Sequence, residues 1–261
     1  TWKNIAEILN KSNRKNCSIN DIRHNGITIT DKNSIANHFN DFFVNIGPNL
    51  ANKIITENKK SYKSYLNKII TSKFYFSPIG QEDLLKTLNS LRPKSSAGHD
   101  GISMNLLKMI FPPLEQPLKL IINQSLITGI FPTQLKIAKV LPLHKKDDTA
   151  IMDNYRPVSL LSSISKLFER VAYNQLKNYF SNNDLFFDSQ YGFREEHSTE
   201  FASLELIDRV LHKLDRKETP VAIYMDLSKA FDTLDHKILL HKLQYYGVAN
   251  TELKWFESYL S

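Results

Sequence analysis

Apolar positions in the first 72 residues recur at helical spacing in two places. The first stripe is made by Trp2, Ile5 and Leu9. The second predicts a helix that starts at Asp31 or Asn33, either of which can cap it, and stops at Gly47-Pro48. The side chains expected on its buried side are Ile35, Phe39, Phe42, Phe43 and Ile46. Between the two stripes, a His-Asn-Gly turn at residues 24–26 leads into a short strand at 27–30.

From residue 74 onward the apolar positions predict mostly helices. The expected helices span residues 77–92, 104–110, 114–128, 163–180 and 200–214. Two short strands at 139–143 and 155–160 are separated by a charged loop, and this arrangement predicts a β-hairpin. Residues 53–73 are polar and basic, so we expect a linker there. These patterns divide the chain into a small basic extension, residues 1–72, and a larger domain, residues 73–261.

The last strong pattern is a run of five apolar residues at 221–225. Its length and its flanks predict a buried strand that ends at Asp226. A helix is expected to follow this strand, to about Tyr246.

The formal charge of +7 is unevenly distributed along the chain. Residues 1–72 hold 11 Lys and Arg against 5 Asp and Glu, whereas residues 73–261 hold 23 against 22. A basic N-terminal segment favours a polyanionic partner such as nucleic acid, although a solvated lysine-rich surface gives the same count. Cys17 is the only cysteine, which excludes an internal disulfide and any multi-cysteine zinc site. No apolar run reaches the roughly 18 residues needed to span a bilayer, so we expect no membrane partner.

Asp226 is the sharpest candidate for chemistry. A carboxylate at the end of a buried strand is well placed to hold a divalent cation, and oxygen ligands suit magnesium. The same strand–Asp–helix order also fits an aspartate that only caps the following helix. Asp232 and Asp235 fall within that expected helix and by default face solvent.

A second candidate is the set of basic residues around the predicted hairpin, Lys139, Lys145, Lys146 and Arg156. Such a hairpin can clamp a triphosphate, with lysine acting as a point charge and arginine as a two-pronged donor. Because Asp147 and Asp148 follow the two lysines, a solvated turn explains the same residues.

Four sequence blocks, taken together, identify a family. They read SSAGHDGI at 95–102, NYRPVSLL at 154–161 with KLFER at 166–170, QYGFR at 190–194, and MDLSKAFDTLDH at 225–236. In order and spacing they resemble the reverse transcriptases of non-LTR retrotransposons, which are LINE-type and here jockey-like. The resemblance covers roughly residues 74–261, and residues 1–72 look like the segment that precedes the polymerase in such proteins.

The resemblance implies a role for particular residues. Asp226 matches the first metal-binding, catalytic aspartate, with the backbone carbonyl of Leu227 as a further ligand. Phe231 matches the ring under the sugar of the incoming nucleotide, and Lys145 and Arg156 match the residues that grip its triphosphate. The residues that match the block near the template and the incoming base are Gln190, Gly192, Phe193 and Arg194.

The resemblance also implies an α+β fold: a helical N-terminal extension, then the fingers and the first part of the palm of a right-hand polymerase. The implied activity is RNA-directed DNA synthesis at a two-metal Mg²⁺ site. Its partners would be an RNA template, a DNA primer, deoxynucleoside triphosphates and a ribonucleoprotein of the element's RNA. The implied localisation is intracellular, in a cytoplasmic ribonucleoprotein and in the nucleus.

Several features depart from the family, among them His99 and His144, which stand where it commonly has proline. Glu195 and Glu196 stand where the family is usually neutral or basic, and no second Asp-Asp block follows Asp226. We therefore expect an N-terminal fragment of a reverse transcriptase that is inactive by itself. Two alternatives stay open, namely a non-catalytic nucleic-acid-binding remnant of a retroelement and an unrelated magnesium phosphotransferase that uses Asp226 alone.

Overall fold

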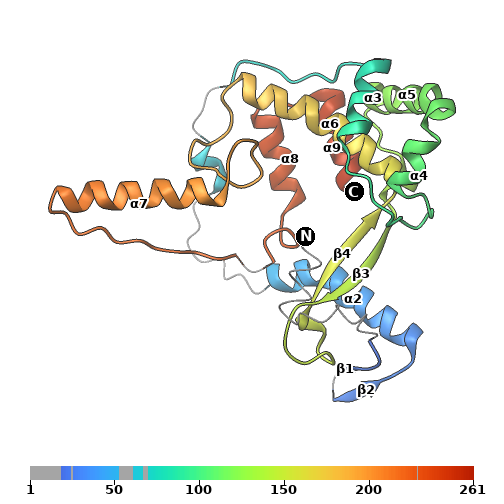
Figure 1. Cartoon of the computed structure of the whole chain (residues 1–261), viewed down its shortest axis with the longest axis horizontal. Coiled ribbons are helices and arrows are strands. Elements are labelled where there is room, and N and C mark those ends of the chain that lie inside the picture. The colour runs from blue at the N-terminus through green and yellow to red at the C-terminus, as the bar shows by residue number, and fades with distance from the viewer. Residues whose placement is uncertain (1–18, 25, 53–60, 67–69, 228) are drawn as a thin grey trace, which may run out of the picture. The chain divides into compact units, whose positions relative to one another are not determined.

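The computed structural model describes residues 19–24, 26–52, 61–66, 70–227 and 229–261. The stripe of Trp2, Ile5 and Leu9 lies outside this part of the chain. Contacts group the chain into two units, the first made of Thr1–Ile54 with Ala138–Leu160 and the second of Ile55–Ile137 with Leu161–Ser261. Figure 1 labels the helices and strands of each unit. The units do not follow the boundary expected after residue 72, and that domain assignment stays a prediction.

The first unit combines a hairpin and a helix with a second, distant hairpin. Its elements are β1 (Ile22–His24), β2 (Ile27–Ile29), α2 (Lys32–Ala51), β3 (Ala138–His144), the 3-10 turn Met152–Asn154 and β4 (Tyr155–Leu161). Strands β1 and β2 pair antiparallel, with Ile22 opposite Ile29, and β3 pairs with β4. Its small core consists of Ile22, Ile35, Phe39, Met152 and Tyr155. Both predicted hairpins are therefore confirmed.

Helix α2 begins where the sequence predicts but ends later. The Asp31 carboxylate accepts a hydrogen bond from the Ser34 backbone N–H at 2.8 Å, so Asp31 is the N-cap. The predicted stop at Gly47-Pro48 is wrong, because the helix continues through Pro48 to Ala51. Proline lacks one backbone N–H, but its carbonyl still accepts from Asn52 at 3.0 Å, so only one bond near the end of the helix is lost.

The second unit is helical. It contains the 3-10 turn Tyr62–Tyr65, α3 (Gln81–Ser90), α4 (Met104–Met109), α5 (Phe111–Thr128), the 3-10 turn Thr133–Lys136, α6 (Ser163–Asn182), α7 (Thr199–Asp215), α8 (His236–Tyr245) and α9 (Asn250–Leu260). The core packs α3, α4, α5, α6 and α9 together, and its largest fully buried side chain is Trp255. The five helices predicted between residues 77 and 214 are confirmed, whereas α9 was not predicted. Among the described residues, no helix is both long and apolar enough to cross a membrane.

Residues 216–235 differ most from the sequence prediction. Residues 221–225 are irregular and exposed, with Met225 88% accessible, so the predicted buried strand is wrong. A strand needs a hydrogen-bonded neighbour, and the sheets of the described residues are β1-β2 and β3-β4 alone. The helix expected from Asp226 begins instead at His236.

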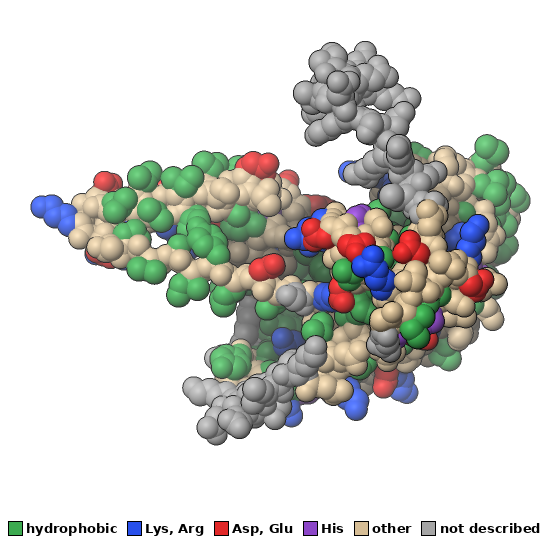
Figure 2. All heavy atoms as spheres, turned by 90° about the horizontal axis from the view of Figure 1, so that it is seen from below, with side chains coloured by type: hydrophobic (Ala, Val, Ile, Leu, Met, Phe, Trp, Pro, Cys, Tyr) green, Lys and Arg blue, Asp and Glu red, His purple; other side chains and the backbone are tan. Residues whose placement is uncertain are grey.

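Helix α7 and the segment after it extend away from the other helices of the second unit (Figure 1). None of the helix's side chains is buried. Figure 2 shows hydrophobic side chains spread over this projection, and those exposed on α7 include Phe201, Leu204, Ile207, Leu211 and Leu214. Together, the two units make a mixed helix-and-strand structure, which agrees with the expected α+β class.

Candidate functional site

Within the second unit, the loop of the first sequence block packs against Leu161, at the end of the NYRPVSLL stretch, and against the start of α6. A Cβ added to Gly98 would lie 2.7 Å from the Ser162 backbone nitrogen and 2.9 Å from the Leu161 carbonyl carbon. The Ser163 hydroxyl donates to the Ile102 carbonyl at 2.8 Å and ties the loop to the start of α6. Only glycine fits at position 98 without a shift of backbone. The sequence pattern alone did not make this loop a strong candidate for a functional site. Gly98 was the residue that could have indicated a close approach of two backbone segments.

The third block, residues 190–194, forms a compact turn. The Gln190 amide donates to the Gly192 carbonyl at 3.2 Å. The Arg194 guanidinium donates to the Phe187 carbonyl at 3.0 Å and lies over the Phe186 ring, 5.4 Å from its centre. Phe193 has a φ of 61° and is 87% exposed. The turn thus uses Arg194 to hold its own backbone and presents Phe193 to solvent.

Phe193 meets the fourth block. Its ring lies edge-on to that of Phe231, with ring centres 5.8 Å apart and an angle of 89° between the planes. Both rings stay largely exposed, Phe231 at 78%. The structure therefore brings together two residues that the resemblance assigns to the nucleotide, although 38 positions separate them in the sequence.

Asp226 and Leu227 lie in the exposed segment after α7, and neither is buried. The alternative in which Asp226 caps a helix is wrong. Asp235 is the residue that caps α8, and its carboxylate accepts from the Lys237 and Ile238 backbone N–H groups at 2.8 and 3.1 Å.

The oxygen donors of Asp226 and Leu227 fit magnesium in kind. They do not complete a site, since the described residues contain no group of three or more His, Cys, Asp or Glu side chains placed to hold a metal ion. A complete two-metal arrangement is thus not formed by the part of the chain that the structure describes.

A cleft of about 570 Å³ lies beside the third block. Its lining residues include Tyr173, Phe180, Phe186, Phe193 and Arg194. At this cleft the unexpected Glu195 is paired with Lys177, at 2.5 Å. The hydrogen bond from the Lys177 ammonium holds the pKa of the Glu195 carboxyl below its usual value. The negative charge of Glu195 is therefore matched locally.

Lys145 and Arg156 belong to the first unit, at the tip and on the return strand of the β3-β4 hairpin. Both are exposed, and neither side chain makes a hydrogen bond or ion pair with the other described residues. Lys146 instead pairs with Asp147 at 3.8 Å. Asp226 and Phe231 belong to the second unit.

Comparison with known proteins identifies the class. The family described as "Reverse transcriptase (RNA-dependent DNA polymerase)" matches residues 143–261, which include the second, third and fourth sequence blocks. This part of the chain belongs to the reverse transcriptase family.

The relatives specify the kind of reverse transcriptase. The chain is 35% identical over 184 residues to a "Probable RNA-directed DNA polymerase from transposon BS" of Drosophila melanogaster, covering 68% of the chain and 20% of the relative. It is 29% identical over 184 residues to the "RNA-directed DNA polymerase from mobile element jockey" of the same fly, covering 70% of the chain and 20% of the relative. The resemblance to jockey-like non-LTR elements is confirmed. The chain spans about one fifth of the length of these relatives.

Proposed function

We propose that the chain is part of an RNA-directed DNA polymerase of a non-LTR retrotransposon. The observation that carries this proposal is the contact between Phe193 and Phe231, since two blocks that recur in the family converge on one exposed aromatic pair. The substrates would be deoxynucleoside triphosphates added to a DNA primer on an RNA template. The polymerase would act within a ribonucleoprotein of the element's RNA, in the cytoplasm and the nucleus.

Each site residue has one role in this proposal. Asp226 and the Leu227 carbonyl would hold Mg²⁺, which when bound supplies charge neutralisation at the reacting phosphates. Phe231 lies under the sugar, and Lys145 and Arg156 bind the triphosphate as exposed cations. The residues near the template and the incoming base are Gln190, Gly192, Phe193 and Arg194.

The domain assignment is part of the same proposal. Residues 1–72 form a basic extension, and residues 73–261 form the fingers and the first part of the palm. In this assignment the β3-β4 hairpin belongs to the fingers.

Phe231 gives the most direct test of the nucleotide site. In a version of the chain lengthened to the size of its polymerase relatives, Phe231→Val is expected to increase ribonucleotide incorporation relative to deoxynucleotide by about tenfold or more. The smaller side chain no longer excludes the 2′-hydroxyl. Single-nucleotide insertion kinetics with matched ribo- and deoxynucleotides measure the ratio. Phe187→Val changes a similarly exposed ring outside the pair and serves as the control. Equal discrimination by the parent and by both variants would contradict this role of Phe231.

A second candidate function is non-catalytic nucleic-acid binding. The observation that favours it is the incomplete carboxylate set among the described residues. In this case the chain binds RNA or single-stranded DNA through its basic residues, with no polymerisation.

Binding should depend steeply on salt under both functions. The reason is that residues 1–72 carry a surplus of six positive charges, 11 against 5. Removing residues 1–72 is expected to weaken binding of a single-stranded RNA and to lower the slope of log affinity against log salt by about 2 or more. Fluorescence anisotropy between about 50 and 200 mM salt measures both quantities. An unchanged slope would mean that the basic segment is only a solvated surface.

A further inference from the structure

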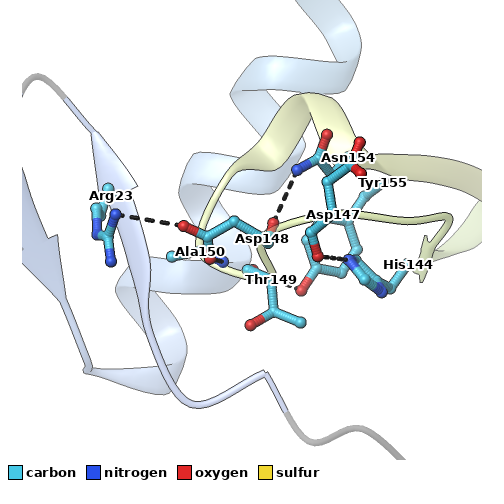
Figure 3. A network of polar contacts seen from close by, with 8 residues as sticks. All are labelled: Arg23, His144, Asp147, Asp148, Thr149, Ala150, Asn154 and Tyr155. Carbon is cyan, nitrogen blue, oxygen red and sulfur yellow. Dashed lines mark hydrogen bonds and ion pairs between the residues drawn. The ribbon is translucent and has the colours of Figure 1, made fainter.

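The loop that joins β3 to β4 carries a lysine pair directly followed by an aspartate pair, a combination that the proposed triphosphate site leaves unexplained. Acidic side chains beside a phosphate-binding lysine oppose binding unless their charge is directed elsewhere. The structure shows where the charge of Asp148 is directed (Figure 3).

Both carboxylate oxygens of Asp148 have partners. One accepts a hydrogen bond from the Ala150 backbone N–H at 2.9 Å, and the other pairs with the Arg23 guanidinium at 3.3 Å. The Asp148 backbone carbonyl accepts from the Asn154 side-chain amide at 2.9 Å. A single residue thus holds the two halves of the loop together and links them to strand β1.

The backbone around Asp148 continues the same link. The Arg23 N–H donates to the Ala150 carbonyl at 2.8 Å, and the Lys145 N–H donates to the Asn154 carbonyl at 2.8 Å. The Tyr155 hydroxyl donates to the Thr149 carbonyl at 2.7 Å. The Tyr155 ring is buried and lies edge-on to Phe39 of α2, 4.9 Å between ring centres. The N-terminal hairpin and helix therefore form the base on which the loop rests.

We propose that Asp148 is a positioning residue, held by Arg23 of the N-terminal segment, that orders the loop presenting Lys145 to a triphosphate. The part concerning the triphosphate rests on the proposed function. The Arg23–Asp148 pair is largely exposed, with side-chain accessibilities of 61% and 43%, and exposed pairs contribute little to global stability. Its effect is local: it fixes the loop and pairs the acidic charge of Asp148 with Arg23.

Amide hydrogen exchange of the 261-residue chain tests the positioning directly. Asp148→Ala is expected to accelerate exchange at Lys145 and Ala150 by about tenfold or more, with exchange in α3 and the melting temperature nearly unchanged. Asp148→Asn keeps an oxygen that accepts from Ala150, so it should restore much of the protection there. Unchanged exchange at Lys145 and Ala150 in Asp148→Ala would overturn the proposal.

A charge-matched control separates position from charge. Asp147→Asn removes the same charge one residue earlier, and asparagine tolerates the left-handed backbone of Asp147, whose φ is 66°. It should leave the exchange at Lys145 and Ala150 as in the parent chain. In the same way Arg23→Gln should accelerate that exchange and Lys32→Gln should not. Equal effects of Asp148→Ala and Asp147→Asn, or of Arg23→Gln and Lys32→Gln, would show that charge alone matters. Such a result would contradict the positioning role.

Binding of inorganic tripolyphosphate extends the test to the proposed ligand. Calorimetry is expected to show binding weakened about threefold to tenfold by Asp148→Ala, as by Lys145→Ala, and unchanged or strengthened by Asp147→Asn. If Lys145→Ala leaves tripolyphosphate binding unchanged, the triphosphate role of Lys145 fails. The exchange data then decide the positioning of the loop independently.

Discussion

Replacement of Asp226 by Asn is expected to abolish primer extension in a version of the chain lengthened to the size of its polymerase relatives. Asparagine keeps the size of the side chain but lacks the negative charge that a carboxylate contributes to a magnesium ion. The loss should exceed about 100-fold. Replacing a residue that only hydrogen-bonds to a metal ligand already costs up to about 100-fold, and Asp226 would be a ligand itself. Single-turnover extension of a DNA primer on an RNA template measures it.

Asp232→Asn is the matched control, since it makes the same change six residues further along the same exposed segment. It should retain most of the activity. The 261-residue chain alone is expected to show no extension with magnesium or manganese, because its described residues gather no set of three metal-binding side chains. Template-dependent extension by that chain, or equal losses for the two substitutions, would contradict the proposed role of Asp226.

Replacement of Trp255 by Ala is expected to destabilise the second unit by about 3–5 kcal/mol. Trp255 is 2% exposed, stacks on Tyr259 with ring centres 5.8 Å apart, and lies edge-on to Phe76 and Phe131 at 5.4 Å each. Its indole N–H donates to the Ser125 hydroxyl at 3.0 Å. Alanine leaves a cavity at the centre of this aromatic cluster and removes that hydrogen bond.

Thermal unfolding followed by circular dichroism measures the effect of Trp255→Ala, which should exceed about 6 °C in Tm. Phe187→Ala provides the control, because that ring is 74% exposed and its truncation should change Tm by less than about 2 °C. A Trp255 variant as stable as the Phe187 variant would mean that α9 does not anchor the core.

Sequence patterns predicted the elements that local residues determine. The turn before Ile27, the cap at Asp31 and the long helix α6 are each specified by neighbouring positions, and each is present. Helix α9 was missed although Trp255 is buried, because Ala249 precedes it without a capping side chain, so no capping residue marks its start. The strand at 221–225 was predicted from apolar character alone, whereas a strand also requires a hydrogen-bonded neighbour.

The candidate site, too, was predicted only in part from the sequence. Motif order identified the family and pointed to Phe193 and Phe231, but their contact depends on how the chain folds back on itself. The Arg23–Asp148 pair joins residues 125 positions apart, and no local pattern indicates such a partner. Gly98 is an intermediate case. The sequence shows that the residue is glycine, but only the structure shows the nearby backbone of Leu161 and Ser162 that requires it.

The first unit also imposes an order on biosynthesis. Its core joins Ile22, Ile35 and Phe39 to Met152 and Tyr155, and residues 55–137 separate the two contributing stretches. At translation rates of about 5–20 residues per second, the ribosome needs roughly 4–17 s to make this interval. During that time the earlier stretch exists without its partner, and its apolar residues are exposed to chaperones and to other nascent chains. The hairpin of β3 and β4 therefore completes a unit whose first stretch was synthesised more than 80 residues earlier.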